Sequence, residues 1–195
     1  MNRINLAICV MVLGGASTAW ATEPQRSPYA GQENREIKSL SAEDLSELRR
    51  GGGWGLAKAA ELNGYPGPAH LLEMKAQIGL GPEQVQAITA IYEAMKAKAI
   101  SAGAKLIALE ETLEQGFRRG TIDAASLEGI LGEIADARRD LRFAHLAAHL
   151  EVRPILTSRQ ITDYNKLRGY DRAGPCGAVP AGHDAALWRR HHQCR

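Results

Sequence analysis

The sequence predicts an all-α protein organised as an elongated antiparallel helical hairpin with shorter flanking helices. From Pro82 to about Gly116, apolar residues recur at spacings of three and four, which is the period of an amphipathic helix. The same spacing recurs from about Asp123 to Val152. No run of alternating apolar and polar residues predicts a strand. At a rise of 1.5 Å per residue the first helix would be about 50 Å long, which favours an elongated hairpin over a globule.

Composition limits both the number of domains and the classes of partner. The chain has 195 residues, of which 45% are hydrophobic, enough for one domain with its own core. The formal net charge is +2, so the sequence predicts neither nucleic-acid binding nor strong attraction to anionic membranes.

Residues 1–21 have the pattern of a signal peptide. Arg3 supplies the positive start, Ile4 to Gly15 is an apolar run, and Ala19-Trp20-Ala21 is a small-x-small cleavage site. The run is shorter than the roughly 20 apolar residues of a membrane-spanning helix. We therefore expect export, cleavage after Ala21, no stable membrane insertion and, as the compartment, a bacterial periplasm.

Residues 22–65 are predicted to form a leader with a short helix and a Gly-rich linker. Residues 22–38 mix Pro, Gln, Ser, Gly and charges without a period, as a flexible segment does. A capping box at Ser41 starts the short helix. In the Gly-rich stretch that follows, residues 51–55, Trp54 is a candidate anchor to the core.

Residues 66–170 are expected to form the helical domain. A helix over 69–78 precedes the hairpin, and a shorter helix follows it through Tyr164 and Leu167. That last helix begins at Leu156-Thr157-Ser158-Arg159-Gln160, where Thr157 is the candidate N-cap and Gln160 can reach back to it.

A related helix start opens the hairpin. In Leu80-Gly81-Pro82-Glu83-Gln84, Gly81 takes the cap and Pro82 suits the first helical position. The glutamine is again the third helical residue, and apolar residues flank the cap as in a hydrophobic staple. Two helices with related starts suggest one helix pair used twice, or two ordinary helix starts.

His145 and His149 are the strongest candidate metal ligands. They are four residues apart, so they share one helix face, and that face is the apolar stripe. A shared metal ion would satisfy both inward imidazoles; the alternative is two histidines bonded to carbonyls or water.

His70 and Met74 repeat this spacing, and an imidazole with a thioether favours zinc, copper, nickel or cobalt over calcium or magnesium. All four side chains converge on one ion if the two helices are adjacent, unless Met74 simply fills the core.

The tail, residues 171–195, combines cysteines and histidines. Cys176 and Cys194 either form a disulfide, which export permits, or act with His183, His191 and His192 as a flexible metal ligand set. The spacing matches no zinc signature, and the two alternatives stay open.

Arg138 and Arg142 fall near the inward side of the second hairpin helix, which is unusual for a closed core. Either their side chains extend to the edge, or that face is partly open and binds a client chain.

Several motifs are absent from the sequence. There is no Cys-x-x-Cys-His for covalent haem, no Glu-x-x-His of ferritin-like di-iron sites, no Gly-x-Ser-x-Gly and no phosphate-binding loop. We therefore do not expect an enzyme.

The paired helix starts resemble the Leu-Thr-x-x-Gln motif of the periplasmic family that includes the Spy, CpxP, ZraP and CnrX proteins. Leu156 to Gln160 matches the motif in full, and Leu80 to Gln84 matches except at Gly81, where the family has Thr. The segments 65–84 and 141–170 are most similar to the heavy-metal-resistance branch. The resemblance covers roughly residues 66–170.

The resemblance implies a four-helix hairpin protomer that forms a homodimer. It also implies two activities: binding of a divalent transition metal through helical His-x-x-x-His and His-x-x-x-Met pairs, and ATP-independent holding of unfolded periplasmic proteins. The expected function is therefore a periplasmic heavy-metal-binding protein of the resistance or sensing type, with His70, Met74, His145 and His149 as ligands. A periplasmic chaperone is the alternative.

Overall fold

The computed structural model describes residues 26–170, 179 and 182–191. The chain divides into two units, Met1–Glu33 and Asn34–Arg195. In the first unit the described residues form turns, closed by backbone hydrogen bonds from Ala30 to Ser27 and from Gln32 to Tyr29. The expected signal peptide, 1–21, and all three cysteines lie outside the described residues.

The all-α prediction is confirmed, since the described residues contain helices and no strand. The helices are α1 (Ala42–Arg50), α2 (Lys58–Glu61), α3 (Pro68–Glu73), α4 (Lys75–Ile78), α5 (Pro82–Arg119), α6 (Ala124–Val152), α7 (Ser158–Leu167) and α8 (Ala185–His191), with a 3-10 turn, η1 (Arg153–Ile155). None of the helices in the described ranges combines the length and apolar character of a membrane span.

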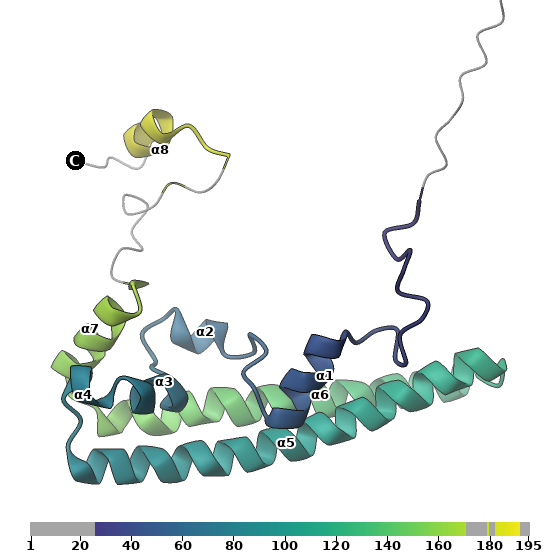
Figure 1. The fold of residues 1–195 in the computed structure, drawn as a ribbon, viewed down its shortest axis with the longest axis horizontal. Helices are drawn as coiled ribbons and strands as arrows, with labels where there is room; N and C mark the ends of the chain where they lie inside the picture. The colour runs from purple at the N-terminus through teal and green to yellow at the C-terminus, as the bar shows by residue number, and fades with distance from the viewer. Residues whose placement is uncertain (1–25, 171–178, 180–181, 192–195) are drawn as a thin grey trace, which may run out of the picture. The chain divides into compact units, whose positions relative to one another are not determined.

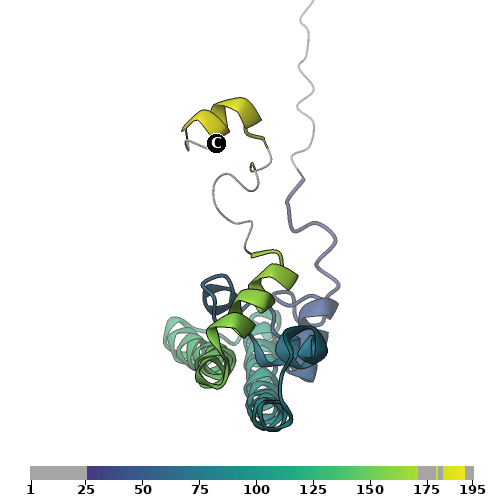
Figure 2. The ribbon, with the colours of Figure 1, turned by 90° about the vertical axis from the view of Figure 1, so that its left-hand side faces the viewer.

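The antiparallel pair α5 and α6 forms the predicted hairpin (Figure 1). Gly120 ends α5 with a φ of +65°, a left-handed conformation that glycine adopts without steric cost. Asp123 then caps α6, where its carboxylate accepts from the Ser126 N–H at 2.8 Å. Figure 2, which looks along the hairpin, shows α4 and α7 on one side of it.

The first hydrophobic cluster joins α1 to the hairpin. Its buried members are Ile37, Leu40, Leu48, Ala99, Leu106, Ile134, Ala137 and Leu141. A Cβ on Gly103 of α5 would lie 2.6 Å from the Leu48 carbonyl oxygen, so glycine is what allows α1 to approach α5 this closely. We expected residues 22–65 as a leader, yet this segment supplies three of the buried core side chains.

The second hydrophobic cluster lies at the end of the hairpin where α5 begins and α6 ends. It consists of Leu71, Ile78, Ile88, Val152, Leu156 and Tyr164. The single helix expected over 69–78 is instead two helices, because Met74 between them has non-helical backbone angles (φ −103°, ψ 17°). The sequence has no proline or glycine at this break, so nothing local to it indicates that the helix is interrupted.

The start at Thr157 has a complete capping box, whereas the start at Gly81 has only the bond to the glutamine side chain, because glycine has no side chain to accept in return. The Thr157 side chain accepts from the Gln160 N–H, and the Gln160 side chain accepts from the Thr157 N–H at 2.9 Å. At the other start, the Gly81 N–H donates to the Gln84 side chain at 3.0 Å.

The two glutamines also bond to each other, which the sequence did not predict. The amide of each donates to the side-chain oxygen of the other, at 3.0 Å and 2.9 Å, across a separation of 76 residues. Gln84 also donates to the Ile155 carbonyl at 2.7 Å, and Gln160 to the Gly79 carbonyl at 3.1 Å. Each carbonyl directly precedes the other motif, so reciprocal hydrogen bonds join the helix starts of α5 and α7.

Candidate metal site in the histidine cleft

His145 and His149 are both buried on α6, with 4% and 6% of their surfaces exposed. Both line an open cleft of about 700 Å³, here called the histidine cleft. Its walls come from the Gly-rich linker, α2, α3, α5, α6 and the segment that follows α7. The prediction that these two histidines point inward from one helix face is therefore confirmed.

The Gly-rich linker forms one wall of the cleft. Gly51 ends α1 with a φ of +67°, and a Cβ there would lie only 3.1 Å from the Lys96 carbonyl oxygen. Trp54 packs against the first hydrophobic cluster, and its indole N–H donates to the Asp44 carboxylate at 2.7 Å. The expected anchoring role of Trp54 is thus observed, and it fixes the linker beside α6.

The tautomer of His149 follows from its hydrogen bond. Its Nδ1 lies 2.7 Å from the Tyr65 carbonyl oxygen, and because a carbonyl can only accept, Nδ1 carries the proton. In the neutral ring, Nε2 therefore carries a lone pair. A backbone carbonyl that holds one imidazole nitrogen in this way is the usual support of a histidine that binds metal through the other.

Gly67 provides the space for this ring. A Cβ at Gly67 would lie 2.9 Å from His149 Cε1 and 3.2 Å from its Nε2. A side chain at this position would therefore displace the ring from its observed place.

His145 has a buried Nε2 without a hydrogen-bond partner in the described part of the chain. Burial lowers the pKa of this imidazole, the charge of nearby His149 lowers it further, and a backbone interaction with Gly52 partly opposes both. The ring is therefore neutral at pH 7, the form that can bind a metal ion.

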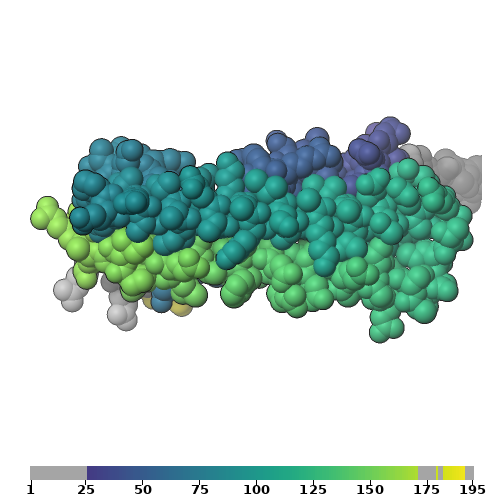
Figure 3. Space-filling view, turned by 90° about the horizontal axis from the view of Figure 1, so that it is seen from below, coloured from purple at the N-terminus to yellow at the C-terminus, as the bar shows by residue number. Residues whose placement is uncertain are grey.

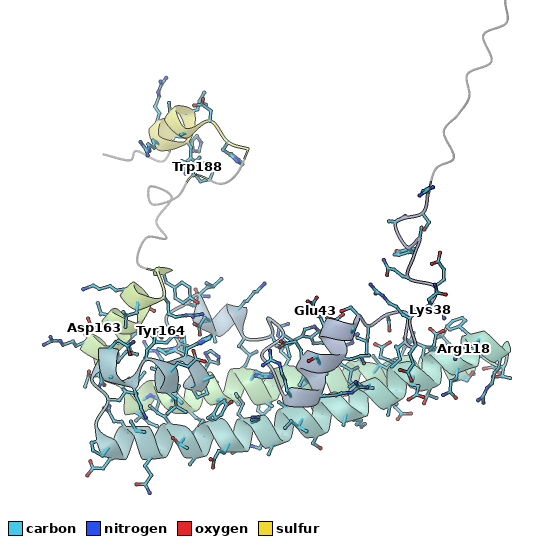
Figure 4. All side chains as sticks on the ribbon, in the orientation of Figure 1. Lys38, Glu43, Arg118, Asp163, Tyr164 and Trp188 are labelled. Atoms are coloured by element: carbon cyan, nitrogen blue, oxygen red, sulfur yellow. The ribbon has the colours of Figure 1, made fainter. Side chains whose placement is uncertain are left out.

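The carboxylate of Glu61 is the centre of a group of polar contacts between α2 and the residues of and after α7. Its Oε1 accepts hydrogen bonds from Tyr164 and, at 3.0 Å, from Tyr170, and it lies 3.3 Å from Arg168 Nε. Its Oε2 lies 3.9 Å from His149 Nδ1. Tyr164 belongs to α7 and is labelled in Figure 4. Its burial, and then the hydrogen bond to Glu61, raise the pKa of its hydroxyl.

The other two predicted ligands differ from each other. His70 lines the cleft, and its Nδ1 lies 3.0 Å from the Glu73 carboxylate. Met74 does not line the cleft and packs against the second hydrophobic cluster, the core-filling alternative. Met95 of α5, by contrast, is buried, belongs to neither cluster and lines the cleft.

Within the described ranges, no three or more His, Cys, Asp or Glu side chains are grouped so as to hold a metal ion. Of the four predicted ligands, His70, His145 and His149 line the same cleft, and Met95 adds a thioether to its lining. Sequence reasoning missed Met95 and Glu61, because a methionine in an apolar stripe and a glutamate in a polar stretch carry no local signal of their place in a cleft.

Arg138 contacts other residues of the protein. It donates to the buried carboxylate of Glu110 at 2.8 Å, and its guanidinium lies 5.7 Å from the centre of the Trp54 ring. Arg142 is exposed. The first of the two arginines is thus part of the packing between α5, α6 and the linker.

A second groove, of about 690 Å³, runs between α5 and α6 and is here called the alanine groove. Figure 3 shows the face of the hairpin that α5 and α6 form together. Alanine is the most frequent residue in its lining, and Phe143 on one rim is 70% exposed. Lys98 and Lys105 lie on its α5 side, and Asp140 and Glu151 on its α6 side.

The predicted roles of the tail rest mostly on residues outside the described ones. Cys176, Cys194 and His192 are among those, so neither the disulfide nor the metal alternative is described. Within the described part, the His183 ring packs edge-on against Trp188 with centroids 5.0 Å apart.

Comparison with known proteins yields no relative. No protein-family model matches the chain, and no curated protein and no solved structure is significantly similar to it.

Proposed function

We propose that this chain is an exported heavy-metal-binding protein of the periplasm, which holds a divalent transition ion at His145 and His149. The observation that carries the proposal is the pair of imidazole nitrogens in the histidine cleft. His145 Nε2 is buried without a hydrogen-bond partner among the described residues, and in the neutral His149 ring Nε2 has a lone pair because the proton is on Nδ1, bonded to Tyr65.

An unpartnered buried polar atom costs about 1–3 kcal/mol, which a metal ion bound at this nitrogen would offset. Neutral imidazoles bind zinc, copper, nickel and cobalt well, and a thioether beside them favours the softer members of that group. Met95 therefore takes the role that the sequence assigned to Met74, while His70 stays a candidate ligand at the cleft edge.

Calorimetric titration of the full chain with zinc, copper and nickel tests the proposal. The His145→Ala/His149→Ala variant should lose one tight site, whereas binding by the tail histidines and cysteines is common to both proteins and cancels in the comparison. Equal binding by the two proteins would remove the histidine pair from the function.

A second candidate function is the holding of unfolded client segments in the alanine groove. The observation that favours it is an apolar groove with a highly exposed phenylalanine on its rim, Phe143. A second copy of the chain is the competing occupant, because the resemblance also implies a homodimer, and light scattering measures that state.

Suppression of client aggregation without ATP should weaken in Phe143→Ser. Phe117→Ser is the matched control, since Phe117 is 59% exposed but does not line the groove. Equal loss of activity in both variants would argue against the groove as the client site.

A further inference from the structure

The histidine cleft is much larger than an ion requires. Its volume of about 700 Å³ lies within the roughly 300–1,000 Å³ of sites for organic ligands. A water molecule occupies about 30 Å³ of liquid, and an ion held by two imidazoles needs only a few such volumes. The aromatic side chains of Trp54, Tyr92 and Tyr170 also line the cleft, which is typical of a site for an organic molecule.

The charge of the cleft opposes a bare cation. Four cationic side chains line it and only two carboxylates do; they are Arg50, Lys58, Lys96, Arg168 and Glu61, Glu73. A hydrated divalent ion approaching His145 and His149 would therefore meet an excess of like charge, which slows and weakens its binding.

The two lysines are the cations available to a ligand. Arg50 pairs with Glu47, and Arg168 pairs with Glu61. Lys58 and Lys96 are exposed and form no ion pair with an acidic side chain in the described part of the chain. Lys58 extends along the linker, with Cε 3.3 Å from the position of a Cβ on Gly55, and Lys96 Nζ lies 5.9 Å from the centre of the Tyr92 ring.

We propose that the histidine cleft binds its metal more tightly as an anionic chelate of a small polycarboxylate than as the hydrated ion. The proposal rests on the proposed metal-binding function and names its ligand. His145 and His149 coordinate the metal at positions that the chelator leaves open. Lys58 and Lys96 bind the carboxylates of the chelator, and the aromatic side chains of the cleft pack against its apolar surface.

Equilibrium dialysis of the full chain with nickel and radiolabelled citrate tests the ligand directly. Nickel citrate is an anion, so labelled citrate should be retained by the protein only when nickel is present. Retention should be lost in His145→Ala/His149→Ala, because the metal joins the chelate to the protein. Retention of nickel with release of all the citrate would overturn the proposal and leave the metal-binding function intact.

Charge variants provide the second arm of the test. Lys58→Gln/Lys96→Gln should bind nickel citrate about tenfold more weakly, and hydrated nickel no more weakly than the wild type does. The matched control is Lys98→Gln/Lys105→Gln, which removes the same charge from the alanine groove and should leave nickel citrate binding unchanged. Equal citrate retention by the wild type and the Lys58/Lys96 variant would also overturn the proposal. Failure of the wild type to retain nickel in either form would instead refute metal binding itself.

Discussion

Gly67 and Gly81 form a natural matched pair for testing the wall of the histidine cleft. They are the N-cap residues of α3 and α5, each followed by proline, with similar backbone angles (φ −87°, ψ 143° and φ −71°, ψ 161°). Their surroundings differ. A Cβ on Gly67 would lie 2.9 Å from His149 Cε1, whereas the nearest atom to a Cβ on Gly81 is the Gln84 side-chain oxygen at 3.8 Å.

The cost of Gly67→Ala follows from these distances. Carbon atoms in contact lie about 3.5–4.0 Å apart, so the His149 ring must withdraw by at least about 0.5 Å. Withdrawal strains the 2.7 Å hydrogen bond from Nδ1 to the Tyr65 carbonyl. Overpacking of this kind costs about 1–3 kcal/mol, while the change of capping residue is common to both variants. Gly67→Ala should therefore be less stable than Gly81→Ala by about that amount.

Urea denaturation followed by circular dichroism measures the difference in unfolding free energy, and calorimetry measures metal affinity in the same proteins. We expect Gly67→Ala to bind metal more weakly than the wild type, because the ring that carries Nε2 has moved, and Gly81→Ala to bind as the wild type does. Identical stability and affinity in the two variants would refute the inferred geometry of His149.

Three further predictions concern the bonds between Gln84 and Gln160, the packing of the core and the pH dependence of stability. Gln84→Ala and Gln160→Ala should each lower the unfolding free energy by about 1–2 kcal/mol, and the double variant should lower it by about 1 kcal/mol less than the sum. A double-mutant cycle measures this difference, and additive effects would contradict the reciprocal bonding of the two glutamines. Gly103→Ala should lower the unfolding free energy by about 1–3 kcal/mol, because a Cβ there meets an α1 backbone oxygen. Gly129→Ala, on an open face of α6, should instead raise it by about 0.5–1 kcal/mol. Equal shifts in the thermal unfolding of the two variants would disprove the close approach of α1 to α5. Burial holds the pKa of His145 below its ordinary value of 6.5, so just below that pH the unfolded chain binds more protons than the folded one. The unfolding free energy should therefore fall on acidification through pH 6.5, and it should fall less in His145→Gln. Urea titrations in which the unfolding free energy changes equally with pH in both proteins would contradict this.

The hairpin was predictable because its signals are local. An apolar period of three to four runs through α5 and α6, and Asp123 caps α6 with its own side chain. The boundary between α3 and α4 carries no such signal, since the break at Met74 contains neither proline nor glycine. The burial of Ile37 and Leu40 in the first hydrophobic cluster also depends on distant contacts with α5 and α6.

Part of the candidate site was predictable for the same reason. His145 and His149 share a helix face with the apolar stripe, so their burial followed from helix geometry alone. The place of Met74 did not, because the packing of α3 and α4 on the second hydrophobic cluster decides it. The pairing of Arg138 with Glu110 likewise joins two helices, and no spacing within one helix indicates it.

The most direct test of the proposed metal site is an anomalous difference map from crystals of the full chain grown with zinc. We expect a peak in the histidine cleft about 2.0–2.1 Å from Nε2 of both His145 and His149, with Nδ1 of His149 still bonded to the Tyr65 carbonyl. A map with zinc bound only elsewhere, and with both Nε2 atoms free of metal, would contradict it.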